Sequence, residues 1–203
     1  MTAPSTLAAG FSDPVLHSQS VFRSVLDAMA NPGRVISLNA PLPATHTALP
    51  QGLAMILLTL ADYETPVFLD HAFDTDLCRQ WIVFHTGAAL TTDSKQSRFA
   101  VLSSQSALLP LDAFDLGDAR YPDRSCTLLI ACPSLSGGDA ITLTGPGIET
   151  THTIAPQGLS QSFWTQLQDN HSLFPLGVDI ILCAETEILA LPRTTLCRMK
   201  DAV

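Results

Sequence analysis

The sequence predicts an α/β fold in which helices cover the faces of a mixed β-sheet. Segments with helical spacing alternate with short apolar runs along most of the 203 residues. Several of those runs are apolar nearly throughout, which is typical of central strands covered on both faces. No internal repeat or low-complexity tract interrupts the pattern. We therefore expect a flexible tail over residues 1–10 and a single α/β domain over residues 11–203.

Four segments have the apolar spacing and the end signals of helices. The first has Ser12 or Asp13 as its cap and Pro14 in its first turn, and it stops at Asn31-Pro32-Gly33. One buried face is expected from its regularly spaced apolar residues, which are Val15, Phe22, Val25, Leu26 and Met29. The predicted helices cover residues 12–33, 51–62, 74–87 and 160–175.

The apolar runs between these helices are predicted to be strands. Residues 139–155 contain two alternating runs around Gly145-Pro146-Gly147, a pattern that indicates a hairpin. Residues 188–195 are expected to close the fold. The other predicted strands cover residues 34–38, 65–70, 98–104, 125–133 and 178–185.

The Gly-Pro-Gly stretch also has to be weighed as a phosphate-binding loop. A Walker loop ends in Gly-Lys-Ser/Thr, and a dinucleotide fingerprint has three spaced glycines; both lead into a helix. Here Ile148 and a strand-like run follow instead, and Pro146 lacks an amide donor that an anion nest would use. A turn is the favoured interpretation, and a turn that contacts a ligand stays open.

Charge content limits the class of partner. Only 14% of the residues are charged and the net charge is −9, so a general nucleic-acid binder, which needs a basic face, is excluded. A surface with few charges fits a chain that buries part of itself against another protein. No basic segment followed by a long apolar run opens the chain, and the longest apolar run is too short for a bilayer. We expect a cytoplasmic protein without a membrane segment.

Motifs for catalysis or metal binding are missing from the sequence. The five cysteines form no C-x-x-C pair, the six histidines show no metal-ligand spacing, and no G-x-S-x-G motif occurs. A Schiff-base cofactor needs a lysine in an apolar pocket, whereas Lys95 lies in a polar loop and Lys200 in the C-terminal tail. No catalytic residue, no metal ligand and no pyridoxal-phosphate site is therefore predicted.

A few charged residues remain as candidates for a site. Asp62 and Glu64 could form a general acid/base pair, but solvation of a helix end or capping of the next element is the favoured interpretation. Arg23 lies on the first helix, and Arg193 lies at the end of an apolar strand. Arg193 could hold a phosphate or phosphonate with two parallel hydrogen bonds, or it could pair with an acid at a subunit interface. The sequence does not decide between these alternatives.

Four stretches together resemble a known family. These stretches are "GFSDPVLHSQSVFRSVLDAMANPGRV", "LTLADYETPVFLD", "LTGPGIE" and "FPLGVDIIL…ALPRTT". In this order, over residues 10 to 195, they are similar to the H subunit of the bacterial carbon–phosphorus (C–P) lyase system. The resemblance implies a three-layer α/β/α sandwich with a mixed sheet, similar to the large domain of pyridoxal-phosphate transferases but without the cofactor lysine.

The resemblance also implies partners and a role. Members form homodimers and join the G, I and J subunits in a core complex, with a functional link to the L subunit. The system converts MgATP and an alkylphosphonate into α-D-ribose 1-phosphonate 5-triphosphate and releases adenine. MgATP is thus a substrate of the complex and not a cofactor of this chain, which would be an essential but non-catalytic subunit.

Polar positions of the family's stretches become our candidates for a ligand cleft or a subunit contact. They are Asp13, Gln19, Arg23, Asp62, Glu64, Asp179 and Arg193. Two hypotheses follow: a subunit that docks its siblings, or a stand-alone phosphonate- or nucleotide-binding protein with a ligand cleft at its dimer interface. An independent enzyme is a third, without a motif to support it.

Overall fold

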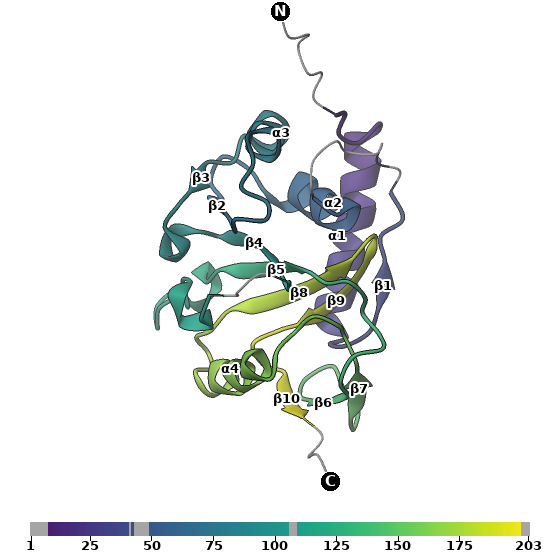
Figure 1. Cartoon of the computed structure of the whole chain (residues 1–203), viewed down its shortest axis with the longest axis vertical. Helices are drawn as coiled ribbons and strands as arrows, with labels where there is room; N and C mark the ends of the chain where they lie inside the picture. The colour runs from purple at the N-terminus through teal and green to yellow at the C-terminus, as the bar shows by residue number, and fades with distance from the viewer. Residues whose placement is uncertain (1–7, 41, 43–48, 106–108, 200–203) are drawn as a thin grey trace, which may run out of the picture.

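A seven-stranded mixed β-sheet forms the centre of the molecule (Figure 1), in the strand order β1-β9-β8-β5-β4-β2-β3. The computed structural model describes residues 8–40, 42, 49–105 and 109–199. The strands of this sheet are β1 (Ile36–Ser37), β2 (Val67–Leu69), β3 (Leu90–Thr91), β4 (Phe99–Ser103), β5 (Thr127–Ala131), β8 (Asp179–Ala184) and β9 (Glu187–Leu191). The predicted α/β class and mixed sheet are confirmed.

Five strands of the sheet run parallel to their neighbours. They are β3, β2, β4, β5 and β8, and β5 pairs with β4 at Leu128↔Ala100 and with β8 at Leu128↔Ile180. The chain then reverses in a tight turn, so that β9 runs antiparallel to β8, and β1 runs antiparallel to β9. Glu185 adopts a φ of 50° in that turn, in the left-handed region.

Different elements cover the two faces of the sheet (Figure 1). The helices α1 (Pro14–Ala30), α2 (Gln51–Leu60) and α3 (Asp76–Thr86) lie on one face. On the other face lie α4 (Gln161–Ser172) and a second sheet of three antiparallel strands. Its strands, in the order β10-β6-β7, are β6 (Ile141–Thr144), β7 (His152–Ile154) and β10 (Leu196–Met199). The expected α/β/α sandwich is therefore corrected: β-structure makes up much of its third layer.

The side chains of the central strands point alternately to the two faces of the sheet and so divide the core into two clusters. Leu129 of β5 and Ile181 of β8 pack under α1, α2 and α3, whereas Leu128 and Ile180 pack against α4 and the small sheet. Successive side chains of a strand point to opposite faces, so a strand covered on both faces must be apolar throughout. This explains the continuous apolar runs of the sequence.

The buried face of α1 differs from the predicted one. Val21, Val25 and Ala28 are its buried residues, whereas Val15, Phe22 and Leu26 of the predicted set are exposed. The helix carries apolar residues on two faces, and spacing alone does not tell which of them meets the core. Its ends were predicted correctly, with Asp13 as the N-cap and Asn31 as the C-cap.

The predicted hairpin is present, and two short strands were missed. β6 and β7 pair antiparallel around the Gly-Pro-Gly turn, with Ile141 opposite Ile154. The strands β3 and β10 were not predicted, because two or four residues carry too little periodicity. β10 extends the small sheet by pairing with β6. Residues 1–7 of the predicted tail and Lys200 lie outside the described residues. Within the described part of the predicted tail, the carbonyl of Ala8 accepts a hydrogen bond from Trp81 Nε1 (3.0 Å).

Candidate functional site

Arg193 and Asp179 form an ion pair at the end of the central sheet. Asp179 begins β8, and Arg193 follows β9, which lies beside it. The Arg193 Nη2 atom lies 2.5 Å from Asp179 Oδ2, and Nε lies 3.2 Å from Oδ1. The backbone amide of Arg193 also donates to Oδ1 (2.8 Å). Only 12% of the arginine side chain and 18% of the aspartate side chain are exposed.

Every N–H group of the Arg193 guanidinium has a partner within the chain. Nη1 donates to the carbonyls of Pro122 (2.7 Å) and Pro175 (3.3 Å), and Nη2 donates to Ser125 Oγ as well as to Asp179. With Nε on Asp179, the five donors of an arginine are used. The side chain thus ties three loops together, and this geometry favours a structural role over a grip on phosphonate.

Asp62 and Glu64 lie in the turn that follows α2. The Asp62 carboxylate accepts the amide of Glu64 (2.9 Å) and the hydroxyl of Thr65 (3.1 Å). The Thr65 hydroxyl in turn accepts the amide of Asp62 (2.7 Å). This is an Asx-type turn, so the capping interpretation of Asp62 fits the geometry better than acid/base chemistry. Glu64 is exposed, and its carboxylate has no hydrogen bond or ion pair within the described residues.

Asp13, Gln19 and Arg23 share the first helix but differ in their surroundings. The Asp13 carboxylate caps α1 by accepting the amide of Leu16 (3.1 Å). Gln19 and Arg23 are exposed on the outer side of the helix, among exposed apolar side chains. Of the seven candidates, the structure therefore brings together only Asp179 and Arg193, while the α1 residues and the turn after α2 are separate features.

The apolar side chains on the outside of α1 define what we call the outer face of α1. Val15, Leu16, Phe22 and Leu26 are between 45 and 78% exposed. Val15, Phe22 and Leu26 follow one another at intervals of seven and four residues, which places them on one side of the helix with the polar Gln19 between them. An apolar stripe of this kind on a single chain marks a surface for another protein.

Three of the family's stretches meet at one corner of the molecule. A Cβ atom on Gly147 would overlap the carbonyl oxygen of Ala30 and lie 2.7 Å from Cδ of Pro32. A Cβ atom on Gly145 would lie 2.7 Å from the carbonyl oxygen of Thr194. The turn therefore fits between the end of α1 and the segment after β9, so its glycines are required for packing. A cavity of about 310 Å³ beside it is lined by Arg34, His152 and neighbouring residues.

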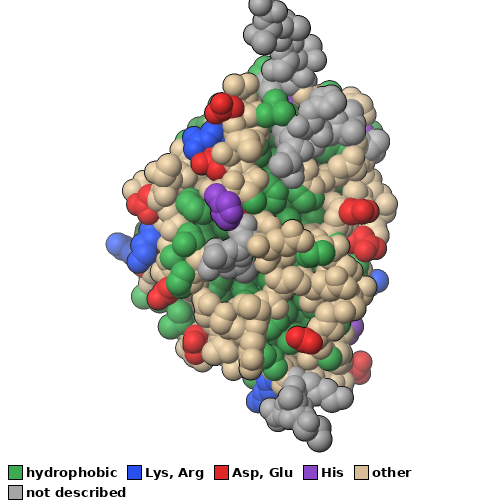
Figure 2. Space-filling view, in the orientation of Figure 1, with side chains coloured by type: hydrophobic (Ala, Val, Ile, Leu, Met, Phe, Trp, Pro, Cys, Tyr) green, Lys and Arg blue, Asp and Glu red, His purple; other side chains and the backbone are tan. Residues whose placement is uncertain are grey.

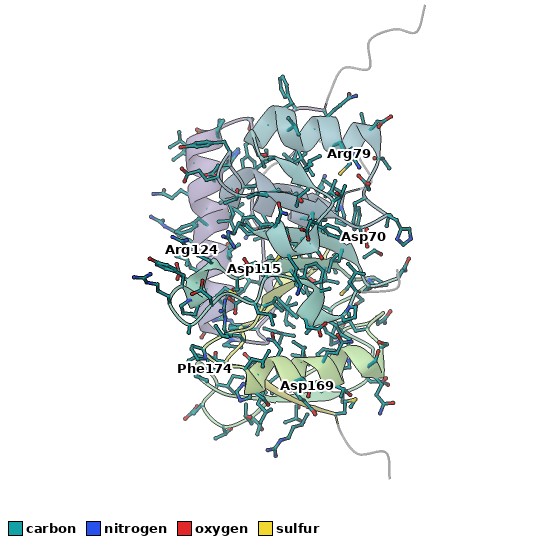
Figure 3. The ribbon with its side chains drawn as sticks, turned by 90° about the vertical axis from the view of Figure 1, so that its left-hand side faces the viewer. Asp70, Arg79, Asp115, Arg124, Asp169 and Phe174 are labelled. Carbon is teal, nitrogen blue, oxygen red and sulfur yellow. The ribbon has the colours of Figure 1, made fainter. Side chains whose placement is uncertain are left out.

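Sequence reasoning missed several polar contacts at the ends of the strands. Asp70 follows β2, and its carboxylate accepts the amides of Ser103 (2.7 Å) and Ala72 (3.0 Å). Arg98 pairs with Asp115 at 2.7 Å and also donates to the carbonyl of Arg124. Figure 3 labels Asp115 and Arg124, which lie near each other, and Asp70. These partners are far apart in the sequence, so no local motif marks them.

The cysteine thiols are buried and kept protonated. Burial raises the pKa of Cys78, Cys126, Cys183 and Cys197 from 9.0 to about 12, and that of Cys132 to about 11. Because the thiolate is the nucleophile, these groups are inert near neutral pH.

We expect alkylation of the folded protein with iodoacetamide at pH 8 to be roughly tenfold or more slower than in denaturant. The measurement is the number of modified cysteines by mass spectrometry against time, with the denatured chain as control. The pKa of each buried thiol is higher in the folded chain than in the unfolded chain. The free energy of unfolding should therefore be constant with respect to these thiols below pH 9 and should fall as pH rises from 9 toward about 12. A thiol that reacts in the folded protein at the rate of free cysteine would show that it is accessible.

Neither a metal centre nor a membrane span was found in the part of the chain that the structure describes. There, no three His, Cys, Asp or Glu side chains gather closely enough to hold a metal ion. None of the helices described is both long and apolar enough to cross a bilayer. Lys95 is exposed in the short helix η1 (Ser94–Gln96).

Comparison with known proteins agrees with the resemblance seen in the sequence. Residues 9–198 match the model of the family described as bacterial phosphonate metabolism protein (PhnH). One relative is the PhnH subunit of alpha-D-ribose 1-methylphosphonate 5-triphosphate synthase from Rhizobium meliloti (strain 1021). Its sequence is 41% identical to this one, over 96% of the length of this chain and 98% of its own length. A Stutzerimonas stutzeri protein named as a C–P lyase subunit, HtxG, is 29% identical over 91% of this chain and 87% of its own. The chain thus belongs to the PhnH family of bacterial phosphonate metabolism proteins.

Proposed function

We propose that this chain is a docking subunit of a C–P lyase core complex, and that it binds its siblings through the outer face of α1. The siblings are the G, I and J subunits, with a functional link to the L subunit. The complex acts in the cytoplasm and supports the formation of α-D-ribose 1-phosphonate 5-triphosphate from MgATP and an alkylphosphonate, with release of adenine. Two relatives that are named as subunits of such systems support this proposal.

The outer face of α1 is the observation that carries the proposal. Four large apolar side chains are exposed on one helix of a protein with only 14% charged residues. Figure 2 shows that the Lys, Arg, Asp and Glu side chains on the face it draws are sparse and lie mostly toward its edges, with apolar side chains between them. Interface energy is concentrated in a few buried anchors, for which Phe22 and Leu26 are suited.

The surroundings of the candidate residues support a subunit that does not itself perform chemistry. Asp13 and Asp62 cap backbone amides, and Asp179 and Arg193 neutralise each other. A pyridoxal-phosphate lysine is not proposed, because Lys95 is exposed in η1. The alternative of a stand-alone binding protein stays a prediction, and Arg23 is the candidate arginine whose side chain is exposed.

A double substitution on α1 tests the docking role. We expect Phe22→Asp with Leu26→Asp to reduce copurification of co-expressed G, I and J subunits at least roughly tenfold, because carboxylates cannot enter an apolar interface without losing their hydration. The measurement is the native mass of the material that is purified through a tag on this chain. Phosphonate-dependent release of adenine should fall in proportion.

Val83→Asp with Phe84→Asp is the matched control, since both residues are exposed apolar residues of another helix, α3. The control should keep the heteromeric mass, and circular dichroism should show that both variants fold. An unchanged complex with the α1 variant would remove the outer face of α1 as the docking surface. A wild-type chain that purifies without partners would contradict the proposed function itself.

A further inference from the structure

A second surface, between α4 and the short helix η2 (Leu111–Ala113), contains an apolar groove. The groove has a volume of about 280 Å³, and Leu111, Leu116 and Leu173 supply its apolar lining. Leu173 and its neighbour Phe174, just past the end of α4, are 45% and 61% exposed. Leu173 lines the groove and is itself exposed, and Phe174 follows it in the chain; we call the groove together with these two residues the α4 groove.

Hydrogen bonds hold the walls of the α4 groove in place. Gln166 Oε1 on α4 accepts the amide of Leu111, which fixes η2 against the helix (2.9 Å). Asn170 is 3% exposed, and its side chain makes two bonds to the backbone of Val178, at 2.8 and 3.0 Å. A preformed groove loses less conformational entropy when a ligand binds than one that must first be ordered.

Two carboxylates lie on the rim of this apolar floor. Asp112 on η2 and Asp169 on α4 both line the groove and are exposed. Neither carboxylate has a hydrogen bond or an ion pair within the described ranges, and none of the lining residues is basic. Figure 3 shows Asp169 on α4 and Phe174 just beyond the end of that helix. The rim thus offers two unpaired negative charges beside an apolar surface.

We infer that the α4 groove is the docking site for a basic, apolar segment of a sibling subunit. An apolar side chain of that segment would fill the space among the leucines, and a Lys or Arg beside it would pair with Asp112 and Asp169. This inference rests on the proposed function and adds a second contact surface to the outer face of α1. The outer face of α1 is apolar and does not require a charged partner, whereas the α4 groove would favour a partner with positive charge.

The shape of the α4 groove favours a protein segment over a small molecule. The groove is open to solvent and not enclosed, with the exposed Leu173 in its lining, whereas small-molecule pockets bury most of the surface of their ligand. One or two side chains that project from a larger surface suit such a groove. The negative rim also disfavours an anionic ligand such as a phosphonate or a nucleotide.

Charge reversal on the rim tests the inference. The probe is a preassembled complex of the G, I and J subunits, and the measurement is its Kd for this chain at several salt concentrations. For Asp112→Lys with Asp169→Lys we expect a Kd at least roughly tenfold higher than for wild type, because like charges would then face each other. Wild-type affinity should weaken with added salt, since the rim pairs are open to screening.

Asp139→Lys with Glu149→Lys is the control, because both residues are exposed acids away from α4 and the change in net charge is the same. The control should bind within roughly twofold of wild type. Equal binding by the rim variant would overturn the inference and leave the proposed function standing. Failure of wild type to bind would instead overturn the proposed function, and the inference with it.

Cross-linking identifies the occupant directly. Since all five native cysteines are buried, Leu173→Cys supplies a single exposed thiol for a reagent with a photoreactive arm. The expected cross-linked peptide belongs to a G, I or J subunit and contains Lys or Arg next to apolar residues. A peptide from a second copy of this chain would assign the groove to self-association and would overturn the inference.

Discussion

Replacing Arg193 with alanine is expected to lower the free energy of unfolding by about 3–5 kcal/mol, the range for breaking a largely buried ion pair. The variant leaves the Asp179 carboxylate without its charged partner, and the carbonyls of Pro122 and Pro175 and the Ser125 hydroxyl lose a donor. Urea denaturation followed by circular dichroism measures the effect, and a lower midpoint with an unchanged slope is the expected form.

Arg193→Lys separates the shape of the guanidinium from its charge, and a second variant serves as a control. Arg193→Lys keeps the charge but cannot reach partners on three sides, so we expect it to recover less than half of the lost stability. Arg79→Ala is the control, because its ion pair with Asp74 is more exposed to water, so the loss of stability should be much smaller than for Arg193→Ala. A stable Arg193→Ala protein that binds its partners but fails in adenine release would return Arg193 to the ligand-binding candidates.

Replacing Gly147 with alanine is expected to cost roughly 2–5 kcal/mol of stability, combining about 1–2 for a left-handed backbone with about 1–3 for overpacking. Gly147 has a φ of 83°, and an added Cβ atom would overlap the carbonyl oxygen of Ala30. Thermal and urea unfolding measure the loss. Because the contact joins the turn to the end of α1, hydrogen exchange of the last turn of α1 should also become faster.

Gly87 provides the matched control for Gly147. It ends α3 with a φ of 72°, but an added Cβ atom would meet nothing within 4 Å. Gly87→Ala should therefore show the backbone cost alone, roughly 1–2 kcal/mol. Equal losses for the two variants would show that the close approach to Ala30 contributes nothing to the stability of the protein.

Local features of the fold could be predicted from the sequence. The caps of α1, the hairpin around Gly-Pro-Gly and the continuous apolar strands follow from rules that act over a few residues. For Arg193 the sequence offered two alternatives, a grip on phosphonate or an ion pair at a subunit interface, and the acid that pairs with it lies in the same chain. That its partner is Asp179, which begins the neighbouring strand, depends on the pairing of β8 with β9.

Features that depend on long-range packing could not be predicted in this way. Both faces of α1 are apolar, so only the position of the sheet shows that Val25 is buried and Phe22 is exposed. Asp112 and Asp169 belong to different elements, and they line one groove because η2 packs against α4, where Gln166 accepts the amide of Leu111. The third layer is partly β-structure because β10 returns to pair with β6, and four residues give no signal of that pairing.

The outer face of α1 also affects how much of this protein a cell can hold. A copy without a partner leaves Val15, Leu16, Phe22 and Leu26 in water, where they favour aggregation and recognition by chaperones and proteases. Burial of the same face in an assembly protects the chain. Under the proposed docking role, the quantity of the sibling subunits would set the quantity of this chain that persists, and the outer face of α1 would thereby balance the subunits after translation.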